Sequence, residues 1–194
     1  QNAVGRAHAA HTIPFETVHL ILETCRSMGT VDNILLDESD GFYALRQSPD
    51  MEEFIGMYKT HPKSFTYDSI PTAPVLSMLI HSKDHRRDIY LNLQEKFGQD
   101  VHFTYFKEYP WIELSDIGSN KGNAMAFVCK TLGIELAETI AIGDGANDLE
   151  MLAAAGLGIS MANADDEVLA IADRVAPHHA EDGVAQILEE IFAL

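Results

Sequence analysis

The stretch TIAIGDGANDLEML, residues 139–152, runs an apolar segment directly into acidic and amide side chains. Asp144 lies between two glycines, and Asp148 follows four residues later beside Asn147. Carboxylate oxygens suit Mg²⁺, which binds through one or two carboxylates and keeps waters for phosphate contacts. Asn147 would lie beside a helix N-terminus, where backbone amides attract anions. We therefore expect Asp144 and Asp148 to hold a metal and Asn147 to contact a phosphate. Either acid alone is more simply explained as a helix cap.

A second candidate lies upstream in SNKGNAM, residues 119–125, where Lys121 comes just before a predicted helix. A lysine at this position can reach a phosphate as a point charge. Most lysines are solvated, so Lys121 alone favours an ordinary surface loop. Together with the G-D-G-x-N-D string on a following strand, it is a far more specific signal.

These candidates belong to a half of the chain in which strands and helices alternate from about residue 115. The expected helices cover 123–132, 147–154, 167–172 and 183–192, and the expected strands cover 139–142, 157–160 and 174–176. Such alternation predicts a parallel sheet with both faces covered. In sheets of this kind ligands bind beyond the carboxyl ends of the strands, which is where Asp144 falls.

The first half reads as a mixed α+β unit. A helix after Pro14 places Phe15, Val18, Leu22 and Cys25 on one face and stops at Gly29. An Asp-Gly step at residues 40–41 between two apolar runs predicts a hairpin. Further helices are expected around 51–59 and up to Gly98, with strands at VLSMLIHS, VHFTYF and WIELS. We expect the boundary between the halves at residues 110–118.

Composition excludes several classes of function. The 194 residues carry 13 basic and 30 acidic side chains, for a formal net charge of −17. Nucleic acids and anionic membranes bind through Lys and Arg, so neither is an expected partner. No apolar run is long enough for a membrane span and no signal pattern is present, so a cytoplasmic protein is expected. The two cysteines, Cys25 and Cys129, show no metal or redox spacing.

The segment from NKGNAMAFVCKTLGI through ETIAIGDGANDLEMLAAAGLGISMANADDEVLAIADRVAPHHAEDGVAQIL resembles the haloacid dehalogenase superfamily, in its Cof-like type IIB branch. The resemblance implies an α/β Rossmann-like core with a parallel sheet and an inserted α+β cap domain. It divides the chain into a core remnant at residues 1–11, the cap at 12–112 and the core at 113–194. The loops SMANA (160–164) and EDGVA (181–185) match family loops that are more structural than catalytic.

Members of this family are mostly Mg²⁺-dependent phosphatases of small phosphorylated metabolites. By resemblance, Lys121 and Asp144 are catalytic: Lys121 steadies the nucleophile and the phosphate, and Asp144 binds magnesium. Asn147 matches the amide that contacts the phosphate, and Asp148 the second acid of the metal site. The substrate stays open among sugar phosphates, nucleotides and pyridoxal phosphate, and specificity is expected from loops around residues 61–74 and 107–111.

One element of the family pattern is missing from these residues. Family members carry a D-x-D-G motif near the N-terminus, whose first aspartate attacks phosphorus to form an aspartyl-phosphate. The nearest string here, LLDESDGF with Asp37 and Asp40, has the wrong spacing and reads as a hairpin turn. We expect the nucleophile in an N-terminal segment outside the chain, or else an inactive family member that binds phosphometabolites or partners. A cation-pump domain and a dinucleotide-binding module fit less well.

Overall fold

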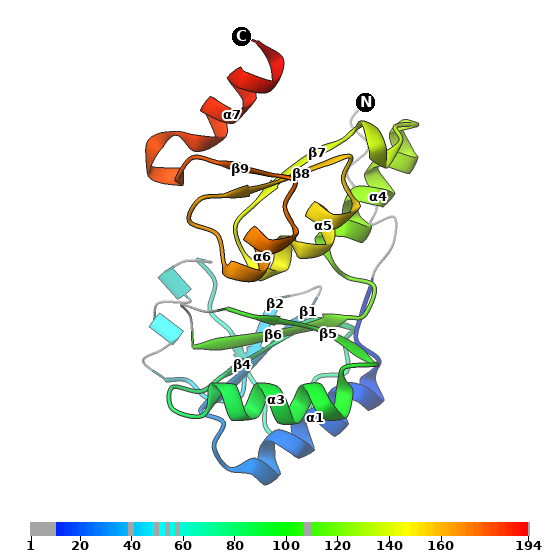
Figure 1. Ribbon diagram of the computed structural model, residues 1–194. Helices are drawn as coiled ribbons and strands as arrows, with labels where there is room; N and C mark the ends of the chain where they lie inside the picture. The colour runs from blue at the N-terminus through cyan, green and yellow to red at the C-terminus, as the bar shows by residue number, and fades with distance from the viewer. Residues whose placement is uncertain are drawn as a thin grey trace. The chain divides into compact units, whose positions relative to one another are not determined.

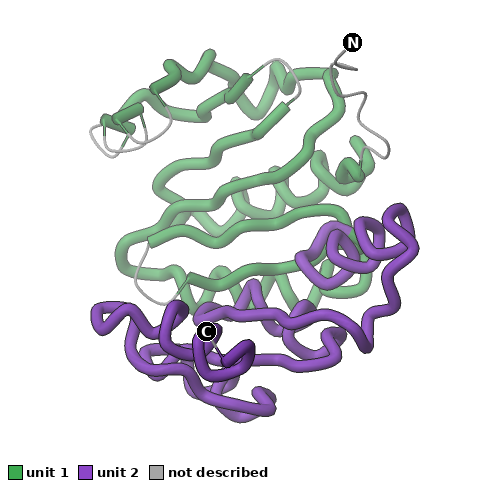
Figure 2. The backbone as a smooth tube through the Cα atoms, turned by 90° about the horizontal axis from the view of Figure 1, so that it is seen from above, with its two compact units in different colours: residues 1–118 green, residues 119–194 purple. Residues whose placement is uncertain are grey.

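The computed structural model describes residues 11–38, 41–48, 51, 52, 55, 56, 59–106 and 110–193. The chain divides into two compact units, Gln1–Gly118 and Ser119–Leu194, coloured separately in Figure 2. A boundary at residue 112 would cut β6 (Trp111–Asp116), which pairs along its length with two strands of the first unit. The division therefore falls after β6, whose two partner strands both belong to the first unit.

The first unit is built on a six-stranded sheet in the order β3-β2-β1-β4-β6-β5. All neighbours run antiparallel except β2 and β3. Helices α1 and α3 cover one face of the sheet (Figure 1). The elements are α1 (Phe15–Met28), β1 (Asn33–Glu38), β2 (Gly41–Ala44), β3 (Lys63–Ser64), β4 (Val75–His81), α3 (Arg86–Phe97), β5 (Val101–Tyr105) and β6.

Helix α1 begins after Pro14 and ends at Gly29, whose positive φ of 68° is the left-handed conformation that glycine adopts without strain. Its buried residues are Val18, Ile21, Leu22 and Cys25. The expected apolar face was wrong at Phe15, which is 50% exposed in the first turn. Burial raises the pKa of the Cys25 thiol to about 12, so this cysteine is a core residue without thiolate chemistry.

The predicted hairpin is present, with Glu38 paired to Gly41 across β1 and β2. Asp40 lies outside the described residues, and so does much of the helix expected at 51–59, although residues 51, 52, 55 and 56 are helical. Alternation along β1 sends Ile34 and Leu36 toward α1 and α3. Asp37 lies on the opposite face, where burial raises the pKa of its carboxyl group, as it does for Glu113 on β6.

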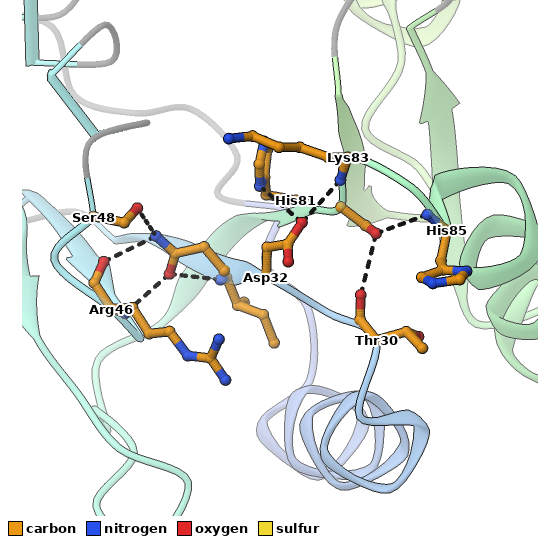
Figure 3. A network of polar contacts seen from close by, with 10 residues as sticks. Thr30, Asp32, Arg46, Ser48, His81, Lys83 and His85 are labelled. Atoms are coloured by element: carbon orange, nitrogen blue, oxygen red, sulfur yellow. Dashed lines mark hydrogen bonds and ion pairs between the residues drawn. The ribbon is translucent and has the colours of Figure 1, made fainter.

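Polar contacts tie the start of β1 to the ends of β4 and β2 (Figure 3). Asp32 accepts a 2.8 Å hydrogen bond from the backbone N–H of Lys83 and lies 3.7 Å from the imidazole of buried His81. The buried Asn33 side chain donates to the Arg46 carbonyl and accepts from the Arg46 amide, both at 2.9 Å. These bonds satisfy polar groups where the strands leave the sheet.

The second unit holds a three-stranded parallel sheet in the order β7-β8-β9. Its apolar residues pack on both faces: α7 covers one, and α4, α5 and α6 lie on the other (Figure 1). The elements are α4 (Lys121–Leu132), η1 (Leu136–Glu138), β7 (Ile140–Gly143), η2 (Ala146–Asp148), α5 (Leu149–Ala154), β8 (Leu157–Met161), α6 (Asp166–Ile171), β9 (Arg174–Ala176), η3 (His179–Glu181) and α7 (Gly183–Phe192).

This parallel arrangement confirms the fold class expected from the alternation of strands and helices. One local detail differs, because the helix expected from Asn147 opens with the 3₁₀ turn η2 before α5 begins at Leu149. Among the described residues, no helix combines the length and apolar character needed to cross a membrane.

Candidate functional site

Three loops of the second unit meet at the carboxyl ends of its parallel strands. Asp144 directly follows β7, and residues 162–165 follow β8. The backbone N–H of Asp165 donates to the Asp144 carbonyl at 3.1 Å, which joins these two loops. The turn that starts after β9 is joined to them through the side chain of Asn163. The candidate site is thus built where ligands of parallel sheets bind.

Asp148 organises the loop after β7. Its side chain is 7% exposed, and Oδ2 accepts hydrogen bonds from the backbone N–H groups of Asp144 at 3.0 Å and Gly145 at 3.2 Å. The other oxygen, Oδ1, lies 2.5 Å from the Lys121 Nζ. A buried carboxylate needs such partners, since an unpaired charge is costly in the interior. The loop is therefore folded around the Asp148 carboxylate.

Gly143 makes this arrangement possible at the end of β7. A Cβ at this position would lie 2.5 Å from the Asp148 Cβ and 2.6 Å from its Cγ, well inside van der Waals contact. Only a glycine lets the Asp148 side chain pass so close to the strand. The glycine before Asp144 in the sequence string thus has a steric cause.

Lys121 is the first residue of α4, two positions earlier than the helix expected at 123–132. The Asn120 side chain caps this helix by accepting from the Asn123 N–H at 2.8 Å. The Lys121 side chain is 48% exposed while it contacts buried Asp148. Because an ammonium group has three donors, Lys121 can hold Asp148 and still donate to an anion.

Asp144 is exposed, and its carboxylate has one partner in the described structure that the sequence did not predict. Asn163 donates from Nδ2 to Asp144 Oδ2 at 3.0 Å, and its Oδ1 accepts from the His179 N–H at 3.1 Å. Asn163 belongs to the SMANA loop, which we expected to be structural only. The expectation missed it because the contact depends on β7 and β8 being neighbours, which spacing alone does not give.

Asn147 and two histidines lie around this group. Asn147 is half-buried in the middle of η2, between the two acids. His178 and His179 stack at 4.4 Å between ring centroids in the turn before α7. His178 Nδ1 accepts from the Ala180 N–H, so this ring supports the turn.

The donor set suits a hard cation that keeps some of its water. Within the described part of the chain, no three or more His, Cys, Asp or Glu side chains are grouped so as to hold a metal by themselves. Zinc sites need more protein ligands than this, whereas Mg²⁺ is commonly held by one or two carboxylates with substrate oxygens. An exposed carboxylate steadied by an amide, as in Asp144, matches that second pattern.

Comparison with known proteins places the chain in a family. Residues 2–188 match the model of the haloacid dehalogenase-like hydrolases. The 5-amino-6-(5-phospho-D-ribitylamino)uracil phosphatase YitU of Bacillus subtilis is 30% identical over 196 residues, covering 98% of this chain and 70% of the relative. A putative phosphatase of Haemophilus influenzae is 33% identical over 143 residues, covering 73% of this chain and 52% of that protein. The chain belongs to the haloacid dehalogenase-like hydrolases.

The fold agrees with this assignment. The solved structure of the subclass IIB sugar phosphatase BT4131 superposes with a TM-score of 0.80 at 22% identity, covering 95% of this chain and 69% of that one. The fold expected from the resemblance is therefore confirmed. The chain spans about half the length of the Haemophilus relative and a little over two thirds of the others.

Proposed function

We propose that the protein carrying this chain is a Mg²⁺-dependent phosphomonoesterase that acts on small phosphorylated metabolites. The observation that carries the proposal is the Asp148 carboxylate, which joins Lys121 to the Asp144 loop at the carboxyl end of β7. This contact gathers a cation and an exposed acid at one edge of the sheet. Charge neutralisation of this kind is what phosphoryl transfer requires.

Each residue takes a separate part in the proposed site. Asp144 would hold the ion, and Asp148, which also contacts Lys121, would be the second acid of the metal site. Lys121 donates to the phosphate, and Asn147 offers its amide to the same group. When bound, Mg²⁺ would polarise the phosphoryl oxygens and neutralise negative charge on them.

The nucleophile of the proposed reaction is an aspartate of a segment outside these 194 residues. Its carboxylate oxygen would form a bond to phosphorus while the bond to the leaving alcohol oxygen breaks, and a second acid would supply the proton. Water then cleaves the aspartyl-phosphate. Among the described residues, β7 pairs with β8 alone, so its other edge has backbone groups that a further strand could satisfy.

A sugar phosphate or a similar metabolite is the proposed substrate class, with the protein in the cytoplasm. The names of the relatives support the substrate class, since they describe a phosphatase of a phosphorylated ribitylamino compound and a sugar phosphatase. The loop at 61–74 is described and contains β3, whereas residues 107–109 of the second expected specificity loop lie outside the described residues. The second candidate function is an inactive family member that binds the same ligands.

Phosphate release from a panel of phosphorylated metabolites, with and without Mg²⁺, tests the proposal on the protein in its full length. We expect turnover to need Mg²⁺ and to fall at least 100-fold in Asp144→Asn and Lys121→Ala, on the scale of lost electrostatic stabilisation. Asn92→Ala, at an exposed position of α3, is the matched control and should keep full activity. Turnover without Mg²⁺, or unchanged turnover in Asp144→Asn, would overturn the assignment. Binding of the substrates without turnover would favour the inactive member.

A further inference from the structure

Asn163 uses both ends of its amide group, in opposite directions. Nδ2 donates to the Asp144 carboxylate at 3.0 Å and Oδ1 accepts from the His179 backbone at 3.1 Å. The orientation of the amide follows from chemistry, because a backbone N–H can only donate and a carboxylate can only accept. The flipped amide would face each partner with the wrong group. A single side chain therefore connects the loop after β7 with the turn before α7.

The loop that carries Asn163 is anchored on β9 and on the loop after β7. The N–H of Ala162 donates to the Ala176 carbonyl of β9 at 2.9 Å, and the N–H of Asp165 donates to the Asp144 carbonyl at 3.1 Å. A further bond of 2.9 Å joins the Ala164 N–H to the Met161 carbonyl within the loop. Asn163 is thus a polar side chain on a fixed backbone, which suits a positioning role.

The other end of the connection is also ordered. In the turn containing η3, the Glu181 N–H donates to the His178 carbonyl at 2.9 Å, and the Gln186 side chain donates to the Glu181 carbonyl at 2.5 Å. The His179 N–H is left pointing at Asn163. Displacement of this turn would pull on Asn163 and, through it, on the Asp144 carboxylate.

We propose that Asn163 is a positioning residue that holds the Asp144 carboxylate in the orientation for binding Mg²⁺ and couples it to the turn at residues 178–181. The proposal rests on the proposed function for the role of Asp144. The amide holds one oxygen of Asp144, Oδ2, so the other oxygen would be left to contact the ion. Hydrogen bonds to the ligands of a metal fix their orientation, and loss of such a partner commonly weakens metal binding 10- to 100-fold.

Mn²⁺ binding to the protein in its full length, followed by the paramagnetic resonance signal of the free ion, tests the effect on the metal site without any turnover. We expect Asn163→Ala to raise the Kd for Mn²⁺ about tenfold or more, with an unchanged circular dichroism spectrum. Asn92→Ala on α3 should leave the Kd at the wild-type value. An equal Kd in Asn163→Ala and wild type would overturn the positioning role.

Amide hydrogen exchange of the metal-free chain tests the coupling independently. In Asp144→Ala, Asn163 loses one of its two partners, and we expect exchange at the His179 N–H to accelerate about fivefold, the factor for one hydrogen bond. The Asp165 N–H is the internal control, because its acceptor is the Asp144 backbone carbonyl, which the substitution keeps. Unchanged exchange at His179, or equal acceleration at Asp165, would overturn the coupling. Failure of wild type to bind Mn²⁺ would reject the metal role in the proposed function and, with it, the first half of this proposal.

Discussion

At the scale of single residues, the two acids of the candidate site have different surroundings. Asp148 is buried and accepts from Lys121 and two backbone N–H groups, whereas Asp144 is exposed and accepts from the Asn163 side chain. The first pattern builds the loop, and the second leaves oxygen lone pairs toward solvent. We therefore infer that Asp144 meets the ion, and that Asp148, the second acid of the proposed metal site, also holds the loop in shape.

This difference predicts a large stability effect at Asp148. In Asp148→Ala, two loop N–H groups and the Lys121 ammonium lose their acceptor, and we expect the second unit to lose about 2–3 kcal/mol of unfolding free energy. The figure is at the low end for a buried ion pair because Lys121 is half exposed. Hydrogen exchange at the amides of β7 and β8 in increasing urea measures it.

The control for this prediction is Glu189→Ala on α7, where the acid is exposed and alanine suits the helix. Its unfolding free energy should stay within about 0.5 kcal/mol of wild type. If Asp148→Ala lost no more unfolding free energy than this, water would be replacing the hydrogen bonds of the carboxylate, and Asp148 would not organise the loop.

At the scale of elements, the close approach of α4 to α5 places Lys121 beside Asp148. A Cβ on Gly122 would lie 2.7 Å from the backbone oxygen of Glu150 and 2.8 Å from its carbonyl carbon. Backbone atoms cannot move aside as the end of a long side chain can. The glycine next to Lys121 therefore fixes how near the two helices come, and so where the lysine lies.

Gly122→Ala should separate the helices at this point. Alanine gains about 1 kcal/mol of helix propensity over glycine, but the overpacking costs about 1–3 kcal/mol, so we expect a net loss of stability of up to about 2 kcal/mol. The Lys121 contact with Asp148 should lengthen as well. Thermal unfolding followed by circular dichroism gives the stability. The ¹⁵N chemical shift of the Lys121 Nζ in NMR spectra reports the contact with Asp148.

A matched substitution separates sterics from propensity. Gly56 is also helical, and a Cβ there would meet no atom of the structure within 4 Å. Gly56→Ala should thus be neutral or stabilising by up to about 1 kcal/mol. If Gly122→Ala stabilised the protein equally, the packing of α4 against α5 would not be as close as described.

Most elements could be predicted because their signals are local. Pro14 and Gly29 mark the ends of α1, and apolar runs alternating with helical patterns indicate the parallel sheet of the second unit. Phe15 shows the limit of periodicity, since a residue in the first turn of a helix can fit the apolar pattern and still face solvent.

The site could be predicted in its residue types but not in its contacts. Lys121 and Asp148 are 27 positions apart, and their meeting depends on Gly122 and Gly143, whose steric role appears only in three dimensions. Asn163 was missed as well, because an asparagine in a loop is ordinarily explained by turn formation.

At the scale of the whole molecule, the chain comprises two units with different folds, and the described metal and phosphate candidates all belong to the second. The net charge of −17 makes weak, scattered binding of divalent cations a real competitor to a specific site. The decisive property is therefore where Mg²⁺ binds on the chain, since binding alone is expected of any acidic surface.

The most direct test is a Mg²⁺ titration of the ¹⁵N-labelled protein in its full length, followed by the amide signals of residues 11–193 in NMR spectra. We predict saturable shifts at residues 144–148 and 163–165, and their loss in Asp144→Asn while the rest of the spectrum is kept. Shifts spread over exposed acids such as Glu189 and Glu190, or shifts at 144–148 that persist in Asp144→Asn, would contradict the assignment of a magnesium site to the end of β7.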